Sequence, residues 1–86
     1  MKIMDYLQFS LRERADARKR ALYGYIEALK DYDNCRKNDD DDEKAFNDHI
    51  EYLASIVRCR KEVYNNATKE FLEMQTLCQE ADSILK

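Results

Sequence analysis

The sequence contains no proline and a single glycine, Gly24, among its 86 residues. Proline and glycine mark most turns and strand ends, so their scarcity excludes a fold of many short strands joined by tight turns. It favours long, uninterrupted helices. A chain of this length forms at most one domain, here 1–86, and has little interior to bury.

Long hydrophobic runs are also missing. No segment approaches the roughly 20 consecutive apolar residues of a membrane span, and residues 1–6 lack the apolar run of a secretory signal. We therefore expect a cytoplasmic protein. The three cysteines, Cys35, Cys59 and Cys78, are odd in number and form no C-x-x-C pattern. We expect them to be reduced, with no disulfide framework and no metal site.

Catalytic motifs are equally scarce. His49 is the only histidine, its acidic neighbours supply no nucleophile, and no glycine-rich loop is present to bind a phosphate. The sequence therefore predicts neither an enzyme nor a cofactor-binding protein.

Charged residues make up 38% of the chain and hydrophobic residues 44%, which is too apolar for a disordered tail. In the first half, positions recur at alternating steps of four and three, the spacing of one helix face. This pattern predicts a helix over about 4–36. The recurring residues are Leu11, Ala15, Arg18, Leu22, Tyr25, Leu29 and Tyr32.

An acidic run, 39–42, follows. Four consecutive aspartates repel one another within a helix and favour a turn or a helix N-cap, so we place a reversal at about 37–42. A calcium loop is the alternative. It would need alternating ligands and a mid-loop glycine, which are absent.

The second half predicts a helix over about 43–85. Its apolar residues keep a four-three alternation throughout, and a second row lies one place before the first. The stripe is wider than one partner helix can cover, so we expect either a dimeric four-helix bundle or a missing third helix. The alternation runs through Phe46, Ile50, Leu53, Val57, Arg60, Tyr64, Ala67, Phe71, Met74, Cys78, Ala81 and Leu85, and the second row is Ile56, Val63, Leu77 and Ile84.

These patterns predict an all-α, long antiparallel helical hairpin of the coiled-coil type that assembles through its helices as a homo- or heterodimer. The tyrosines fit this packing as anchors. The predicted helix-packing residues are Leu22, Tyr25, Leu29, Phe46, Ile50, Leu53, Ile56, Val57, Val63, Tyr64, Phe71, Met74, Leu77 and Ile84.

Charge divides unevenly: 1–38 carry nine Lys/Arg against six Asp/Glu, and 39–86 carry six against twelve. A turn near Asp40 would place residues whose numbers sum to about 80 opposite one another. Basic side chains would then form a band suited to phosphates or anionic lipid headgroups, unless they are ordinary solvated residues. The band would comprise Arg12, Arg14, Arg18, Lys19, Arg20, Arg58, Arg60 and Lys61.

Two of these residues, Arg18 and Arg60, occupy apolar positions of the alternation. They fix the register or extend to the surface. Nucleic acid is not an expected partner, because the net charge is −3.

The order of motifs resembles the last two helices of the BAR domain of sorting nexins. An Asp-Tyr-Leu entry at 5–7 precedes Arg-Ala-Leu at 20–22 and Asp-Tyr at 31–32, followed by an acidic connection and a long returning helix. The resemblance implies a crescent-shaped dimer that binds curved, anionic endosomal membrane and supports protein transport and sorting. It implies the basic band as the membrane-binding residues. The family's first BAR helix and its PX domain have no counterpart here, and the acidic tip would repel anionic lipid.

A coiled-coil interaction module without membrane activity is the alternative. The segment 25–32 also suggests an adaptor of tetratricopeptide or microtubule-interacting-and-transport type. Those modules have shorter helices, and no internal repeat is present here.

Overall fold

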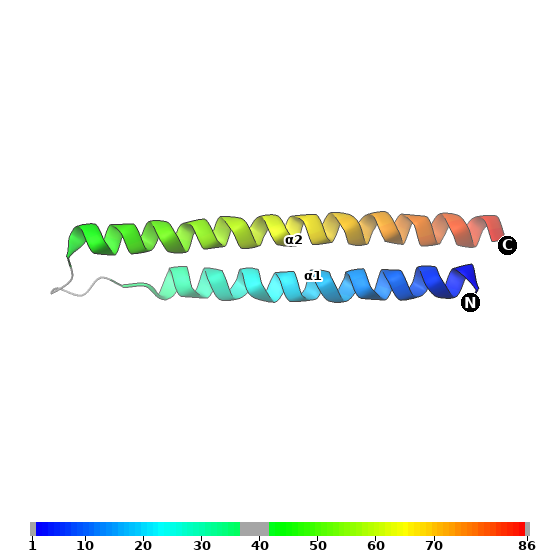
Figure 1. Ribbon diagram of the computed structural model, residues 1–86, viewed down its shortest axis with the longest axis horizontal. Helices are drawn as coiled ribbons and strands as arrows, with labels where there is room; N and C mark the ends of the chain where they lie inside the picture. The colour runs from blue at the N-terminus through cyan, green and yellow to red at the C-terminus, as the bar shows by residue number, and fades with distance from the viewer. Residues whose placement is uncertain (1, 37–41, 86) are drawn as a thin grey trace.

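The computed structural model describes residues 2–36 and 42–85. They form two helices, α1 (Ile3–Asn34) and α2 (Glu43–Leu85). The helices lie side by side and antiparallel, with both chain termini at the same end (Figure 1). The molecule measures 68 × 15 × 14 Å. The predicted all-α antiparallel hairpin is thus confirmed.

The helix ends differ little from the predicted ones. α1 begins one residue earlier and ends two residues earlier than predicted, and α2 spans the predicted range. The predicted acidic reversal and the calcium-loop alternative lie outside the described residues, apart from Asp42. There the Asp42 carboxylate accepts a hydrogen bond from the Lys44 backbone N–H at 3.1 Å, and Glu43 occupies the first turn. Asp42 therefore acts as the N-cap of α2, and both acids face the positive end of the helix dipole.

The C-terminus of α1 is capped from the connection. The N–H of Cys35 donates to the Tyr32 carbonyl at 3.3 Å. The Arg36 guanidinium donates to the carbonyls of Asp33 and Cys35. A cation at this position satisfies free carbonyls and complements the negative end of the helix dipole.

A row of apolar side chains on α2, which we call the seam, packs against α1. Met74 is 9% exposed and is the one described residue of α2 classed as buried. The rest of the predicted α2 alternation is half-buried, with Arg60 and Leu85 exposed. Because a two-helix hairpin covers only one side of each helix, the described residues of α1 and α2 form no larger core.

The inner face of α1 is rotated relative to the predicted one. Its most buried residue is Ala28, at 6% exposure, which was not in the predicted row, whereas the predicted Tyr32 is exposed. Ala21 and Arg14, which lie at heptad spacing from Ala28, are half-buried. Alanine carries a weak hydrophobic signal, so the larger residues beside this row dominated the sequence pattern.

The predicted register is also wrong. Cys78 donates its S–H to the Leu7 carbonyl at 3.4 Å, and Gly24 lies against Arg60. Opposed residues therefore have numbers that sum to about 85, not 80. α2 consequently extends past the end of α1 at the tip (Figure 1). The connection between Asn34 and Glu43 is long enough to permit an offset of one helix along the other. The packing of the seam against α1 therefore sets the register.

Candidate interaction surfaces

Arg18 lies between the two helices, on rings contributed by α2. Its guanidinium carbon is 5.4 Å from the centroid of the Phe71 ring and 6.0 Å from that of Tyr64. The Tyr64 ring also lies 6.3 Å from the Tyr25 ring. These distances are within the range of cation–π and tilted aromatic pairs. Arg18 therefore occupies an inward position of α1 by stacking on these two rings. This contact fits the predicted role of Arg18 in fixing the register better than it fits a role as a ligand site.

The same contact alters the Tyr64 phenol. Hydrogen bonding from Arg18 lowers the pKa of Tyr64 below its ordinary value, because a cationic donor stabilises the phenolate. Burial acts in the opposite direction and does not reverse the shift. The pKa therefore reports on the Arg18 contact.

The predicted basic band is not assembled by the observed register. Arg18 lies level with Tyr64 and Phe71, while Arg60 lies level with Gly24. The six positions between Arg18 and Gly24 correspond to ~9 Å along the helix. The basic segments 18–20 and 58–61 are therefore offset along the hairpin.

Carboxylates also border two of the arginines. Arg14 shares one recess with Glu70 and Glu73. Arg14 and Arg20 line a second recess with Glu13, Asp16 and Glu70. Opposite charges this close offset the positive potential along this edge. Of the predicted phosphate and lipid candidates, Arg14 and Arg18 are half-buried, and the exposed ones are Arg12, Lys19, Arg20, Arg58, Arg60 and Lys61.

A second apolar row runs along α2 outside the seam. Val63 and Leu77 are 49% and 50% exposed, and Ile84 is 81% exposed. They are separated by multiples of seven residues, so they follow one side of the helix. α1 does not cover this row, as expected from a stripe wider than one helix.

Small residues of α1 border this exposed row. The recesses described above bring Leu77 beside Arg14, and Glu70 of the same row beside Ala17. Ser10 and Gly24 lie seven positions on either side of Ala17 and are half-buried like it. We call the combined surface the open face, comprising Val63, Leu77 and Ile84 of α2 with Ser10, Ala17 and Gly24 of α1. The large apolar residues of α2 and the small residues of α1 thus lie side by side, with the charged Glu70 and Arg14 between them.

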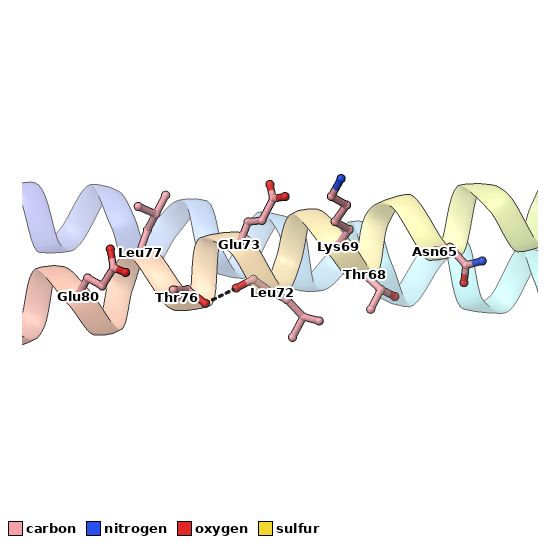
Figure 2. A pocket seen from close by; sticks show the side chains of 8 residues that line it. All are labelled: Asn65, Thr68, Lys69, Leu72, Glu73, Thr76, Leu77 and Glu80. Carbon is pink, nitrogen blue, oxygen red and sulfur yellow. Dashed lines mark hydrogen bonds between the residues drawn. The ribbon is translucent and has the colours of Figure 1, made fainter.

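The outer surface of α2 combines polar and charged side chains with two exposed leucines, Leu72 and Leu77. Figure 2 views it with α1 behind: Leu77, Glu73 and Lys69 project to one edge, and Leu72 and Thr68 project to the other. The Thr76 hydroxyl donates to the Leu72 carbonyl at 3.0 Å within its own helix. The residues lining this surface all belong to α2. One helix cannot enclose a ligand, so this is an open surface and not a binding cavity.

The predicted helix-packing residues therefore divide into two sets. Met74 is buried, and most of the others are half-buried along the hairpin. Val63, Leu77 and Ile84 are exposed on the open face. The half-buried set is Leu22, Tyr25, Leu29, Phe46, Ile50, Leu53, Ile56, Val57, Tyr64 and Phe71.

The tyrosines were predicted to serve as core and interface anchors, and within the hairpin two of them pack between the helices. Tyr25 and Tyr64 are half-buried and paired. The other four, Tyr6, Tyr23, Tyr32 and Tyr52, are exposed. Tyr23 instead supports Lys19, whose ammonium lies 6.0 Å from its ring centroid. The helical period places aromatic rings on the outward side of α1 as well as the inward side.

Comparison with known proteins assigns no family to this chain. No protein-family model, no curated protein and no solved structure matches this chain. Within residues 2–36 and 42–85, neither helix has a stretch apolar enough to cross a lipid bilayer. In the same ranges, no three His, Cys, Asp or Glu side chains gather as metal ligands would.

Proposed function

We propose that this hairpin is a helical scaffold module whose open face packs against further helices. The observation that carries the proposal is the exposure of Val63, Leu77 and Ile84 beside the small row of α1. Clustered exposed apolar residues bordered by polar ones, here Glu70 between Val63 and Leu77, are typical of interaction sites. Helix packing against such a row follows the heptad spacing of its anchors.

A matched pair of leucines tests the proposal. Leu77 and Leu72 are each 50% exposed and lie on opposite edges of α2 (Figure 2). We expect sedimentation velocity to detect association of the parent chain, and we expect Leu77→Glu, alone or with Val63→Glu, to abolish it. Leu72→Glu should preserve it. Circular dichroism should show equal helicity in all variants, because the substituted residues are exposed.

Two results would reject the scaffold proposal. One is a parent chain that sediments as a monomer at every concentration. The other is association that survives both Val63→Glu and Leu77→Glu. Equal loss on Leu72→Glu would also count against the open face, because it would indicate a general effect of added charge.

We propose as a second candidate that the module belongs to a BAR-type sorting nexin and contributes to endosomal membrane curvature and protein sorting. The 68 Å rod shape and the exposed basic residues Arg20, Arg58 and Lys61 support this idea. The offset of the two basic segments and the carboxylates beside Arg20 favour the scaffold function without membrane activity. The membrane would be bound peripherally.

Vesicle sedimentation separates the two candidates. With vesicles of phosphatidylcholine and phosphatidylserine, the membrane candidate predicts binding that weakens with salt. Arg20→Glu and Arg58→Glu should each weaken it further, since a basic residue at the surface contributes roughly 1 kcal/mol. Sedimentation unchanged by both substitutions would contradict the membrane candidate and leave the scaffold proposal intact.

A further inference from the structure

Arg14 and Arg18 are the two half-buried basic residues in the described ranges 2–36 and 42–85. A charge that is partly removed from water costs free energy unless an opposite charge lies beside it. Arg14 shares its recess with the carboxylates of Glu70 and Glu73. Arg14 therefore has its counter-charge within the hairpin.

Arg18 borders a separate recess between α1 and α2, which we call the basic recess. The α1 residues that line it follow one another at steps of three or four, so they share one side of that helix. The lining contains two cations and no carboxylate, whereas each of the two recesses beside Arg14 has one more carboxylate than guanidinium. The basic recess is thus the positive one of the three. It is lined by Ala15, Arg18, Lys19 and Leu22 of α1 and by Tyr64 of α2.

Arg18 keeps hydrogen-bond donors available in this recess. Its contacts with Phe71 and Tyr64, at 5.4 and 6.0 Å, use the charge of the guanidinium and consume none of its N–H donors. A hydrogen bond to the Tyr64 phenol occupies one direction, and the other N–H groups remain. The stacking by itself explains a role in the register, and the recess adds a place where the remaining donors can act.

The volume of the basic recess limits what it can bind. It measures about 200 Å³, which is below the roughly 300–1,000 Å³ of pockets that hold drug-sized ligands. A nucleotide is therefore too large for it. A phosphate group, with one phosphorus and four oxygen atoms, takes up at most the volume of five water molecules, roughly 150 Å³. A single anionic group of this size fits the recess.

Charge and donor chemistry favour a phosphate monoester over a carboxylate. A phosphate monoester carries a charge of roughly −1.5 to −2 at neutral pH, which balances both cations of the recess, whereas a carboxylate balances one. Arginine binds phosphate through paired N–H donors, lysine binds it as a point charge, and the Tyr64 hydroxyl can donate a further hydrogen bond. The Lys19 ammonium lies 6.0 Å from the Tyr23 ring centroid, and its flexible stem lets it turn toward a ligand.

We propose that the basic recess binds a phosphate monoester group through Arg18, Lys19 and Tyr64, supplied as free phosphate or as the headgroup of a lipid such as phosphatidic acid. The bound group gives Arg18 the counter-charge that Arg14 receives from carboxylates of the hairpin. The inference goes beyond the scaffold function, because no residue of the recess belongs to the open face. It also differs from the membrane candidate, which is supported by exposed basic residues outside the recess.

Lys19→Ala and Arg20→Ala form a matched pair of variants. Each removes one exposed positive charge from α1, but Arg20 lies outside the basic recess, among carboxylates. Inorganic phosphate would be titrated into the full chain at constant ionic strength, and the NMR signals of the ring-labelled Tyr64 would be followed. We expect saturable shifts. Lys19→Ala should weaken the binding about five- to tenfold, because a charge-assisted contact is lost, and Arg20→Ala less than about twofold.

Vesicle sedimentation distinguishes the two sources of phosphate. Phosphatidylcholine vesicles that contain phosphatidic acid present a phosphate monoester, whereas those with phosphatidylserine present a diester. A response of Tyr64 to inorganic phosphate, with the expected order of the two variants, supports the site with free phosphate as its ligand. Binding to the phosphatidic acid vesicles alone, again weakened more by Lys19→Ala than by Arg20→Ala, supports the site with a lipid headgroup as its ligand.

Two results would overturn the inference. One is a Tyr64 signal that does not respond to phosphate, together with no binding to phosphatidic acid vesicles. The other is equal weakening by Lys19→Ala and Arg20→Ala, which would indicate general attraction to basic residues. Leu77→Glu, on the open face, should leave phosphate binding unchanged. The failure of the phosphate site and the failure of the scaffold function are thus separate results.

Discussion

The seam and the α2 row of the open face run parallel along the same helix, but α1 covers the first and leaves the second exposed. Met74, in the seam, is 9% exposed, and Leu77, three residues later on the open face, is 50% exposed. Both are large, apolar and good helix formers. What differs is the neighbour, since α1 covers one row and leaves the other open. The comparison shows that burial in a two-helix fold depends on the second helix more than on the residue type.

Among the changes that test this difference between the two rows, Met74→Ala should have the largest effect on stability. Removal of a buried methionine side chain leaves a cavity, so we expect the free energy of unfolding to fall by about 2 kcal/mol or more. Urea denaturation followed by circular dichroism measures this. Leu77→Ala should cost under about 1 kcal/mol at concentrations where the chain is monomeric, and more as concentration rises. Equal costs at low concentration would contradict the difference between the two rows.

Arg18→Ala tests the charged residue that lies between the two helices. The guanidinium stacks on Tyr64 and Phe71, and partly exposed cation–π pairs each contribute about 0.5–1 kcal/mol. We therefore expect a loss of about 1 kcal/mol in urea denaturation, and a smaller loss for Arg18→Lys. Arg20→Ala is the matched control, because Arg20 is exposed. A larger loss for Arg20 than for Arg18 would show that stacking contributes little.

Gly24→Ala should raise stability. A Cβ at this position would meet the Cδ and Nη1 atoms of Arg60 at 3.7 Å, an ordinary contact distance. Alanine gains about 0.5–1 kcal/mol over glycine within a helix. Thermal unfolding at low protein concentration should therefore show a higher midpoint. The added methyl group lies on the open face, so if the chain associates through this face any gain should shrink as concentration rises.

The smallest effect concerns titration of Tyr64. Arg18→Leu should raise the pKa of the Tyr64 phenol toward its ordinary value, because the donor that stabilises the phenolate is removed. NMR of ring-labelled tyrosine as a function of pH measures the change. Arg20→Leu should leave the pKa of Tyr64 unaltered. If the two variants shift the pKa equally, the cause is general charge and not the contact of Arg18 with the ring.

Periodicity predicted the seam of α2 well because its anchors are large. Phe46, Phe71 and Met74 lie on the inward side, although the exposed Arg60 interrupts the alternation between them. The N-cap of α2 could also be predicted from the sequence, since Asp42 precedes a helix with Glu43 in its first turn. Local chemistry of this kind acts over a few residues and therefore appears directly in the sequence.

The register of the two helices and the rotation of α1 about its axis could not be predicted in the same way. Both depend on how two surfaces fit, and a shift of a few residues preserves a heptad pattern while changing every opposed pair. The small residues that decide the fit, such as Ala28, Ala17 and Gly24, carry little hydrophobic signal of their own. Ala17 and Gly24 lie seven residues apart, as do Ala21 and Ala28, and this spacing was the available clue. The predicted pairing of segments 18–20 and 58–61 is wrong for this reason, because it required opposed residue numbers to sum to about 80, whereas Arg60 lies level with Gly24. Their binding of phosphates or lipids stays a prediction.

Finally, the shared position of the two termini determines how the hairpin should respond to force. Tension applied between the ends acts first on the contact nearest them, where Cys78 donates to the Leu7 carbonyl, and then on each following contact in turn. The helices would peel apart from one end, with few interactions bearing load at any moment. Tension applied between the tip and the termini would instead act along α1 and α2 in parallel, so that the backbone hydrogen bonds within the helices carry the load and the seam stays closed. The rod should therefore resist stretching along its length and yield readily when its two ends are separated.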